Sequence, residues 1–288
     1  MLFFKQQKEP DAPPQEDPVT IDAGTGDTLP AAYYITTACA THIGTREYQQ
    51  DAAYVTEGGL YTDESAECAV GIICDGMGGM EHGERASGEA ITVFAEALSK
   101  IGPETDIPAY LEIEVQAVNA AVRRIGEPGG HGTGTTLIAA VIRRNHLHWV
   151  SVGDSRIYIL RGDEIVQVTT DHNYGMRLKA QVEEGKITPE AAAEHPQREA
   201  LISYIGMEFV EEIGLNYNPF PLLHDDIILL CSDGLTKSLS DDDIYTAITE
   251  QRDNIQEAAR LLPLKAFDAS LGSQDNTSVI LMKYEIIG

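Results

Sequence analysis

Short apolar runs, rich in β-branched residues and bounded by Gly or Asp, recur along the chain from residue 33 onward. Such runs predict strands, and several are apolar at successive positions, which predicts sheets covered on both faces. The runs are YYITTACATH, CAVGIIC, TTLIAAVIRR, HLHWVSVG, SRIYILRGDEIVQVT, DIILLCSDG and TSVILMKY. The segments RIYIL and EIVQV, placed around RGDE, predict a hairpin with a short turn.

Helices are predicted between these runs. Residues 84–99 and 108–125 carry apolar residues at three- and four-residue spacing, so each should pack one face on a sheet. A third helix is predicted after Ser240, a capping residue followed by acids. A fourth is predicted after Thr188, because Pro189 suits the first helical position.

The order of these elements indicates the fold class. Strands come first, then two helices, a meander of strands, a helical insertion near 172–205, one strand, two helices and a last strand. This order does not alternate strand and helix as a doubly wound parallel sheet would. We therefore expect an α+β fold, a four-layer α-β-β-α sandwich of two mostly antiparallel sheets flanked by helices.

Composition narrows the functional classes. The 288 residues include 20 Lys plus Arg and 46 Asp plus Glu, a formal net charge of −26, which disfavours a nucleic-acid partner. The four cysteines lack the paired spacing of a zinc site or a disulfide framework and are expected to be reduced core residues.

No stretch approaches the roughly 18 apolar residues of a membrane span, and MLFF is too short for a signal peptide, so we expect a cytoplasmic protein. Residues 1–31, rich in Pro, Asp and Gly, predict a flexible leader.

Aspartates stand repeatedly beside the predicted strands. Asp75, Asp154 and Asp233 each follow an apolar run, whereas Asp51 and Asp275 each precede one. A single such Asp is usually a turn residue that bonds its own backbone. Five of them suggest instead that carboxylates meet at one edge of the sandwich, where they repel unless cations neutralise them.

The residue types in this pattern favour hard divalent cations. Carboxylate oxygens without His or Cys among them suit Mg²⁺ or Mn²⁺ better than zinc or copper. Gly76, directly after Asp75, would let a backbone carbonyl approach an ion closely, although a plain turn glycine is an equal alternative.

Seven ordered blocks resemble one family. They are GTREYQQDA, CDGMGGMEHGERAS, GTGTTLIAAVI, SVGDSRIYILRGDEIVQVTTDHN, EEGKITPEAAAEHPQREALISYIG, CSDGLTKSLSDDDI and QDNTSVILM. In order and spacing they resemble the metal-dependent protein serine/threonine phosphatases, the protein phosphatase 2C or PPM family, most closely its bacterial branch. The resemblance covers roughly residues 34–285 and implies one phosphatase domain over residues 32–288, with a flap subregion at 172–206.

The resemblance also implies a two-metal centre, usually of Mn²⁺ or Mg²⁺, and direct hydrolysis of phosphoserine and phosphothreonine by a water that bridges the ions. Carried over by motif, the carboxylate ligands are Asp51, Asp75, Asp233 and Asp275. Asp75 is expected to bridge the two ions, and Gly76 to supply a backbone carbonyl.

Two further roles follow from the same resemblance. Asp154 matches the residue that, with Asp233, holds a weaker third ion in bacterial members. Arg46 matches the arginine that grips the substrate phosphate, and its planar fork suits two phosphate oxygens. Phosphorylated proteins, substrates of a serine/threonine kinase, are the implied partners, and we expect a monomer.

The chain departs from the family pattern at several positions. Met77 and Met80 stand where many relatives carry histidine, so the general acid assigned to the first of these positions does not transfer. His82 is nearby but is expected to face solvent at a helix start. Gln49 and Gln50 replace the usual Asn and Glu, which predicts altered metal affinity.

Other motifs carry less information. In the flap, the residues SYIG at 203–206 replace a usual Thr-Arg pair, a change expected to alter substrate choice. His146 and His148 alternate along a predicted strand without a third ligand, so an ordinary strand face is the better interpretation. GGHGTGTT lacks the lysine of a nucleotide phosphate loop.

Three functional hypotheses remain open at this point. The first is an active metal-dependent phosphatase. The second, motivated by Met77, Met80 and Gln49, is a pseudophosphatase that binds phosphoproteins without turnover. The third, a two-metal phosphodiesterase or nuclease, is opposed by the acidic charge.

Overall fold

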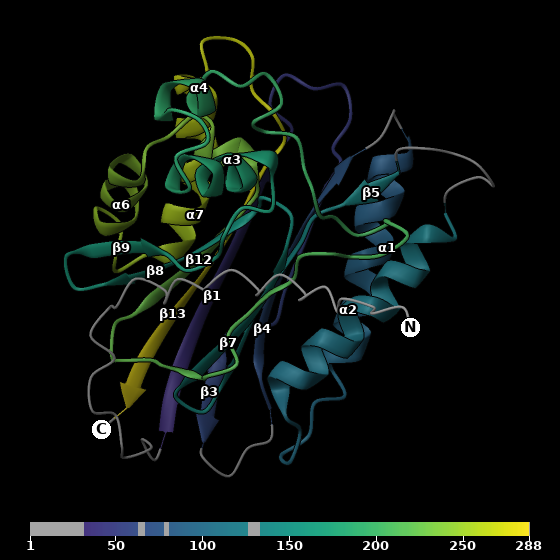
Figure 1. Cartoon of the computed structure of the whole chain (residues 1–288). Coiled ribbons are helices and arrows are strands. Elements are labelled where there is room, and N and C mark those ends of the chain that lie inside the picture. The colour runs from purple at the N-terminus through teal and green to yellow at the C-terminus, as the bar shows by residue number, and fades with distance from the viewer. Residues whose placement is uncertain (1–31, 63–66, 78–80, 126–132, 288) are drawn as a thin grey trace, which may run out of the picture.

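A computed structural model describes residues 32–62, 67–77, 81–125 and 133–287 of the chain. The predicted leader at 1–31 lies outside the described residues. Two sheets lie face to face, with helices α1 and α2 on one outer side and α6 and α7 on the other (Figure 1). The predicted α-β-β-α sandwich is therefore confirmed.

The first sheet has six strands. Its central strands β1, β13 and β12 lie side by side, and β1 pairs with β13 along its whole length, from Ala32 opposite Ile287 to His42 opposite Thr277. The strand order is β3 (Gly59–Thr62), β1 (Ala32–His42), β13 (Thr277–Ile287), β12 (Ile227–Cys231), β8 (Arg156–Arg161) and β9 (Glu164–Gln167). The predicted hairpin is the β8–β9 pair, where Arg161 faces Glu164 across a two-residue turn.

The second sheet has seven strands. Its main order is β10 (Gly214–Leu215), β7 (His146–Val152), β6 (Leu137–Arg143), β4 (Ala69–Met77) and β2 (Asp51–Val55). Two short strands lie off this order: β11 (Phe220–Pro221) pairs with β7, and β5 (Gly134–Thr135) pairs with β4. Every strand pairing within the described ranges is antiparallel.

Alternate side chains of the central strands enter different apolar cores, which explains why their sequences are apolar throughout. In β12, Ile228 and Leu230 lie in the core between the sheets, and the other three residues pack on the helix side. In β6, Ile138 belongs to the core between the sheets, whereas Leu137 faces the helices. The two-residue period of a strand therefore fills two cores at once.

The helices lie close to the predicted ranges, although α1 begins three residues before the predicted 84–99 and α2 ends two residues before the predicted end at 125. On one side lie α1 (Glu81–Leu98) and α2 (Ile107–Arg123), and on the other α5 (Asp233–Thr236), α6 (Asp241–Thr249) and α7 (Ile255–Ala269). Ser240 caps α6 in a capping box, because its Oγ accepts from the Asp243 N–H at 3.2 Å while the Asp243 carboxylate accepts from the Ser240 N–H. Among these helices and the rest of the described chain, none has both the length and the apolar composition needed to cross a bilayer.

The flap contains two shorter helices, α3 (Tyr174–Glu183) and α4 (Pro189–Ala193). Thr188 caps α4 as predicted, since its Oγ1 accepts from the Ala191 N–H at 3.2 Å. Within the described residues, none of the four cysteines forms a disulfide. Their expected place in the core holds for Cys74 and Cys231, whereas Cys39 is exposed.

Candidate metal centre

Five aspartates come from different elements but act on one another. Asp51 is the first residue of β2 and Asp75 lies opposite it in β4. Asp233 begins α5 directly after β12, Asp275 precedes β13, and Asp154 follows β7. Repulsion from the other four aspartates contributes to the raised pKa of Asp75. The predicted convergence of the carboxylates at one edge of the sandwich is therefore observed.

A cavity of about 500 Å³ opens at this edge. Its lining includes four of the five aspartates, Arg46 and Gly76, and also residues from the flap. The lining residues are Arg46, Gln50, Asp75, Gly76, Met77, Thr136, Asp154, Glu199, Leu201, Tyr204, Asp233, Lys237, Asp275 and Asn276. The fifth aspartate, Asp51, lies beneath it, 8% exposed.

Asp75 and Gly76 are placed differently from the sequence prediction. The strand was expected to stop at Asp75 and turn at Gly76, but β4 continues through Met77. It continues because β5, far along the chain, pairs with it and sets Gly76 opposite Thr135. A Cβ at Gly76 would overlap the backbone carbonyl of Gly83 and lie 2.7 Å from that of Gln50, so close packing, not a turn, requires glycine here.

Burial dominates the electrostatics of the carboxylates. It raises the pKa of Asp75 well above its usual range, and repulsion from Asp51 and Asp233 adds to the rise. Burial likewise raises the pKa of Asp51 to about 6, opposed by a hydrogen bond that Ser232 Oγ donates to Asp51 Oδ2 at 2.7 Å. Burial, followed by repulsion from Asp233, raises the pKa of Asp154 to about 7. The protein therefore holds more negative charge here than its own groups neutralise.

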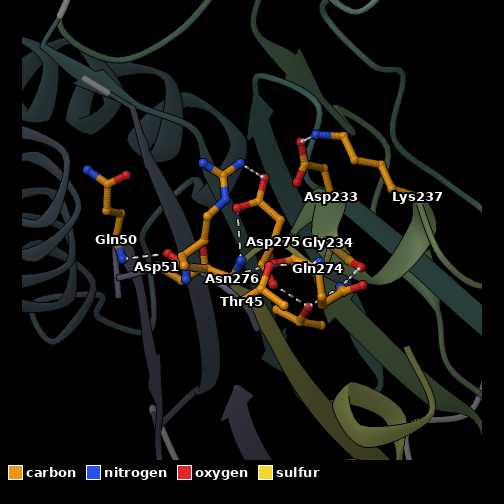
Figure 2. A network of polar contacts seen from close by, with 12 residues as sticks. Thr45, Gln50, Asp51, Asp233, Gly234, Lys237, Gln274, Asp275 and Asn276 are labelled. Atoms are coloured by element: carbon orange, nitrogen blue, oxygen red, sulfur yellow. Dashed lines mark hydrogen bonds and ion pairs between the residues drawn. The ribbon is translucent and has the colours of Figure 1, made fainter. Parts of the chain in front are cut away.

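Two basic side chains contact the cluster. Arg46 Nη2 lies 2.8 Å from Asp275 Oδ2, with the arginine side chain 59% exposed. Lys237 Nζ forms an ion pair with Asp233 Oδ2, four residues before it in sequence (Figure 2). Asp51 Oδ1 and Asp233 Oδ1 nevertheless remain buried without a hydrogen-bond partner.

These unpartnered oxygens fit hard divalent cations, which bind oxygen ligands. In the described part of the chain, no three His, Cys, Asp or Glu side chains are placed so that they could hold one metal ion together. That arrangement still suits Mg²⁺, which keeps several waters and uses one or two carboxylates per ion. The donor set therefore fits the predicted metal type.

A hydrogen-bonded network holds the loop that carries Arg46 (Figure 2). The Thr45 N–H donates to the Gln274 carbonyl at 2.9 Å, and the Gln50 N–H donates to Asn276 Oδ1 at 2.7 Å. Gln274 Nε2 also donates to the Gly234 carbonyl at 2.6 Å, which ties the loop before β13 to α5. Sequence reasoning missed these residues, although Gln274 and Asn276 flank Asp275 in the QDN block.

The positions that depart from the family pattern are also located. Met77 lines the cavity, so an apolar thioether occupies that part of the wall. His82 is exposed in the first turn of α1, as predicted. Both amide atoms of Gln49 are buried without a partner, whereas the Gln50 carbonyl accepts from the Gly76 N–H at 3.1 Å. Met80 lies outside the described residues.

A second cavity, of about 1050 Å³, lies beside the first and extends under the flap helices α3 and α4. The two cavities share Asp154, Glu199, Asp233 and Lys237. Tyr204, from the SYIG segment, lines the smaller cavity and would contact any side chain added at Gly134. The flap therefore forms part of the wall of the candidate site.

The histidine pair on β7 belongs to the sheet rather than to this site. His148 is buried, and burial lowers its pKa to about 4. His146 is partly buried on the same strand. Neither residue lines the two cavities described above.

A four-layer sandwich with a carboxylate-lined cavity and an arginine at one edge is the architecture of a metal-dependent phosphatase. The chain matches the model of the protein phosphatase 2C family over residues 39–267. It belongs to that family.

Curated proteins of similar sequence are named serine/threonine phosphatases. The serine/threonine phosphatase stp of Listeria welshimeri is 31% identical over 235 residues, which span 80% of this chain and 90% of that protein. The serine/threonine protein phosphatase PstP of Mycobacterium tuberculosis is 37% identical over 215 residues, 73% of this chain and 39% of that protein.

Solved structures agree with the fold. The crystal structure of the Mycobacterium tuberculosis phosphatase PstP/Ppp superposes with a TM-score of 0.72 at 32% identity, covering 88% of this chain and 99% of that one. The catalytic domain of PstP in complex with two manganese ions gives a TM-score of 0.70 at 30% identity, with the same coverage.

Proposed function

We propose that this chain is a metal-dependent protein phosphatase that hydrolyses phosphoserine and phosphothreonine with two Mn²⁺ or Mg²⁺ ions. One observation carries the proposal: aspartates from five separate segments cluster at one edge of the sandwich, four of them line one cavity, and buried oxygens of Asp51 and Asp233 lack partners. Family membership supports the same reaction class.

Each site residue has a proposed role. Asp51, Asp75, Asp233 and Asp275 would be the carboxylate ligands of the ions, and the Gly76 carbonyl would be a further ligand. When bound, such ions polarise a phosphoryl oxygen and acidify a water that can serve as nucleophile. Asp154 lines the same cavity as Asp233, at the place where the family resemblance implies a weaker third site.

The lining of the smaller cavity supports hydrolysis without a phosphoenzyme. No Ser, Cys or His is among its described lining residues. Its threonine, Thr136, already engages its hydroxyl with Ser155 Oγ at 2.8 Å and with the Asp75 N–H at 2.9 Å. This described lining therefore offers no serine, cysteine or histidine nucleophile.

Arg46 is proposed to bind the substrate phosphate. Its guanidinium lies on the cavity wall, mostly exposed, and contacts Asp275 through one nitrogen. Planar guanidinium groups bind two phosphate oxygens together, which would orient phosphorus within the cavity. Met77 offers no proton to the leaving oxygen, so the general acid of relatives with histidine there is not proposed for this chain.

The convergence of all five aspartates does not favour a phosphoprotein-binding pseudophosphatase, because the ligand set is intact. We further propose that the substrates are proteins phosphorylated by a serine/threonine kinase and that the protein acts as a cytoplasmic monomer. The absence of a bilayer-spanning helix from the described ranges is consistent with that location.

The test is Mn²⁺-dependent hydrolysis of p-nitrophenyl phosphate and of a phosphothreonine peptide by the wild type and by Asp233→Asn. Loss of several kcal/mol of transition-state stabilisation corresponds to a decrease of about 10³-fold. Asp242→Asn, an exposed acid in the first turn of α6, is the matched control and should keep full activity. Equal turnover by Asp233→Asn would remove the metal assignment, and faster cleavage of bis-p-nitrophenyl phosphate would favour a phosphodiesterase.

A further inference from the structure

The side chain of Lys237 places a positive charge next to the carboxylate of Asp233. It follows the single turn of α5, and its side chain reaches back to Asp233, the first residue of that helix. Side chains four residues apart meet on one helix face, so the local sequence DGLTK fixes this contact. Figure 2 shows the ammonium group directed at the Asp233 carboxylate.

Asp154 lies within the electrostatic reach of the same ammonium group. Lys237 and Asp154 line both cavities together with Asp233. The positive charge of Lys237 opposes the rise in pKa that burial causes at Asp154 and at Asp233. One lysine therefore acts on both carboxylates that the family resemblance assigns to a third ion.

The other basic side chains around the two cavities have different partners. Arg156 donates through Nε and Nη2 to Asp171, at 2.9 and 2.7 Å. Lys179 lies 3.9 Å from Glu183, and Arg198 lies 3.5 Å from Glu199. Arg46, in turn, forms its ion pair with Asp275. Among the described basic residues that line the two cavities, Lys237 is the one whose ion pair is with Asp233.

We propose that the Lys237 ammonium group is a built-in cation beside Asp154 and Asp233, which replaces the third divalent ion. The proposal rests on the proposed function, because it assumes the two-ion centre. A divalent ion placed on Asp154 and Asp233 would meet a fixed positive charge, and like charges at such short range repel strongly. The chain therefore binds two ions and not three, and Lys237 is a positioning residue that holds Asp233 in the cavity.

The experiment counts bound Mn²⁺ per full-length chain by equilibrium dialysis and elemental analysis, up to millimolar free metal. The wild type should saturate at two ions. Lys237→Gln, which removes the charge and keeps the side-chain length, should take up a third, weaker ion. Lys237→Arg keeps a positive charge and should stay at two.

Two controls separate a specific third site from general attraction of Mn²⁺ to an acidic protein. Lys179→Gln makes the same charge change in the wall of the larger cavity and should leave the count at two. Adding Asp154→Asn to Lys237→Gln should return the count from three to two, since one ligand of the new site is lost. Circular dichroism on each variant verifies that the fold is intact.

The outcomes are distinguishable. Three ions in the wild type, or two in a folded Lys237→Gln variant, would overturn the proposal while leaving the phosphatase function standing. No saturable Mn²⁺ in the wild type would overturn the two-ion centre itself, and the lysine proposal with it.

Discussion

An aspartate lies near each end of strand β12, and the two carboxylates differ in how completely they are paired. Before the strand, Asp226 is 1% exposed and fully paired: Arg161 donates through Nε to Oδ1 at 2.9 Å and through Nη2 to Oδ2 at 2.6 Å. The Leu223 N–H adds a third hydrogen bond at 2.8 Å. After the strand, Asp233 Oδ1 is buried without a partner and Oδ2 contacts Lys237.

The neighbouring strand β8 explains the difference. It carries an arginine at each end, and its register sets Arg156 opposite Cys231 at the Asp233 end of β12. Arg161 neutralises Asp226, but Arg156 is held by Asp171 and does not contact the aspartate cluster. At the Asp226 end of β12 the negative charge is therefore paired within the protein. At the Asp233 end, carboxylate oxygens are left that external cations could bind. A buried charge without a partner is costly, so the second arrangement indicates function rather than stability.

The largest effect is predicted for a substitution that breaks the ion pair between Asp226 and Arg161. Asp226→Asn leaves the buried Arg161 charge uncompensated and should lower the free energy of unfolding by about 3–5 kcal/mol, measured by urea denaturation. Asp225→Asn is the matched control, because that neighbouring acid is 43% exposed and its partner Lys283 keeps a second ion pair with Glu285. The control should change stability by less than about 1 kcal/mol. Equal effects of the two variants would contradict the contrast.

A smaller effect is expected from Arg46→Ala. Loss of a charge-assisted contact to phosphate, about 2 kcal/mol, should reduce kcat/KM for p-nitrophenyl phosphate about 30-fold. The number of bound Mn²⁺ ions should not change. Arg260→Ala, which removes an exposed arginine paired with Glu257 on α7, should leave kcat/KM unchanged. Loss of Mn²⁺ binding in the Arg46 variant would show that this arginine serves the metal centre instead.

The carboxylate end should also respond to pH. Burial raises the pKa of Asp51 to about 6 and that of Asp154 to about 7, from 3.8, so the folded metal-free protein holds protons that the unfolded chain has released. Their contribution to stability is fully present below pH 3.8, decreases as the pH rises above that value, and is fully lost once the pH has passed the folded pKa values of about 6 and about 7. Mn²⁺ bound at Asp51 and Asp75 must displace protons from these ligands, so its apparent affinity should rise with pH, by at most about tenfold per pH unit for each proton released.

The measurement is the unfolding midpoint with and without Mn²⁺ from pH 5.5 to pH 8. Taking the difference cancels the contributions of buried histidines far from the cluster, such as His148. We expect the difference to grow with pH and to level off above about pH 8. A difference that stays constant across this range would contradict ionisation-linked metal binding.

The smallest effect is predicted for His82→Ala. The side chain is exposed at the start of α1 and does not line the described cavity, so kcat should change by less than about twofold. A tenfold decrease in kcat, with loss of one limb of the pH-rate profile, would instead identify His82 as the proton donor.

Much of this contrast could be predicted from the sequence. Strands such as β12 and β6 were identifiable because apolar residues at successive positions report burial on both faces. The five aspartates were identifiable as a candidate cluster because each stands next to a buried strand, whereas the choice of four of them as metal ligands followed from the family resemblance.

Other features depend on contacts between distant segments, which a local pattern does not contain. The extension of β4 through Met77 requires β5, some sixty residues later in the chain. The departure of Arg156 toward Asp171 depends on where the chain runs after β9. The contact of Lys237 with Asp233 depends on the helical turn of α5 directly after β12, which was not predicted from the sequence.

The most direct test of the central claim is a Mn²⁺ titration of the wild type and Asp75→Asn at pH 7.5, with free Mn²⁺ followed by electron paramagnetic resonance. Asp75 lies opposite Asp51 in the sheet and is repelled by all four other aspartates, so it should be the residue shared by both ions. We predict two bound ions for the wild type and loss of the pair in Asp75→Asn. Two ions retained with unchanged affinity in the variant, or none in the wild type, would contradict the account.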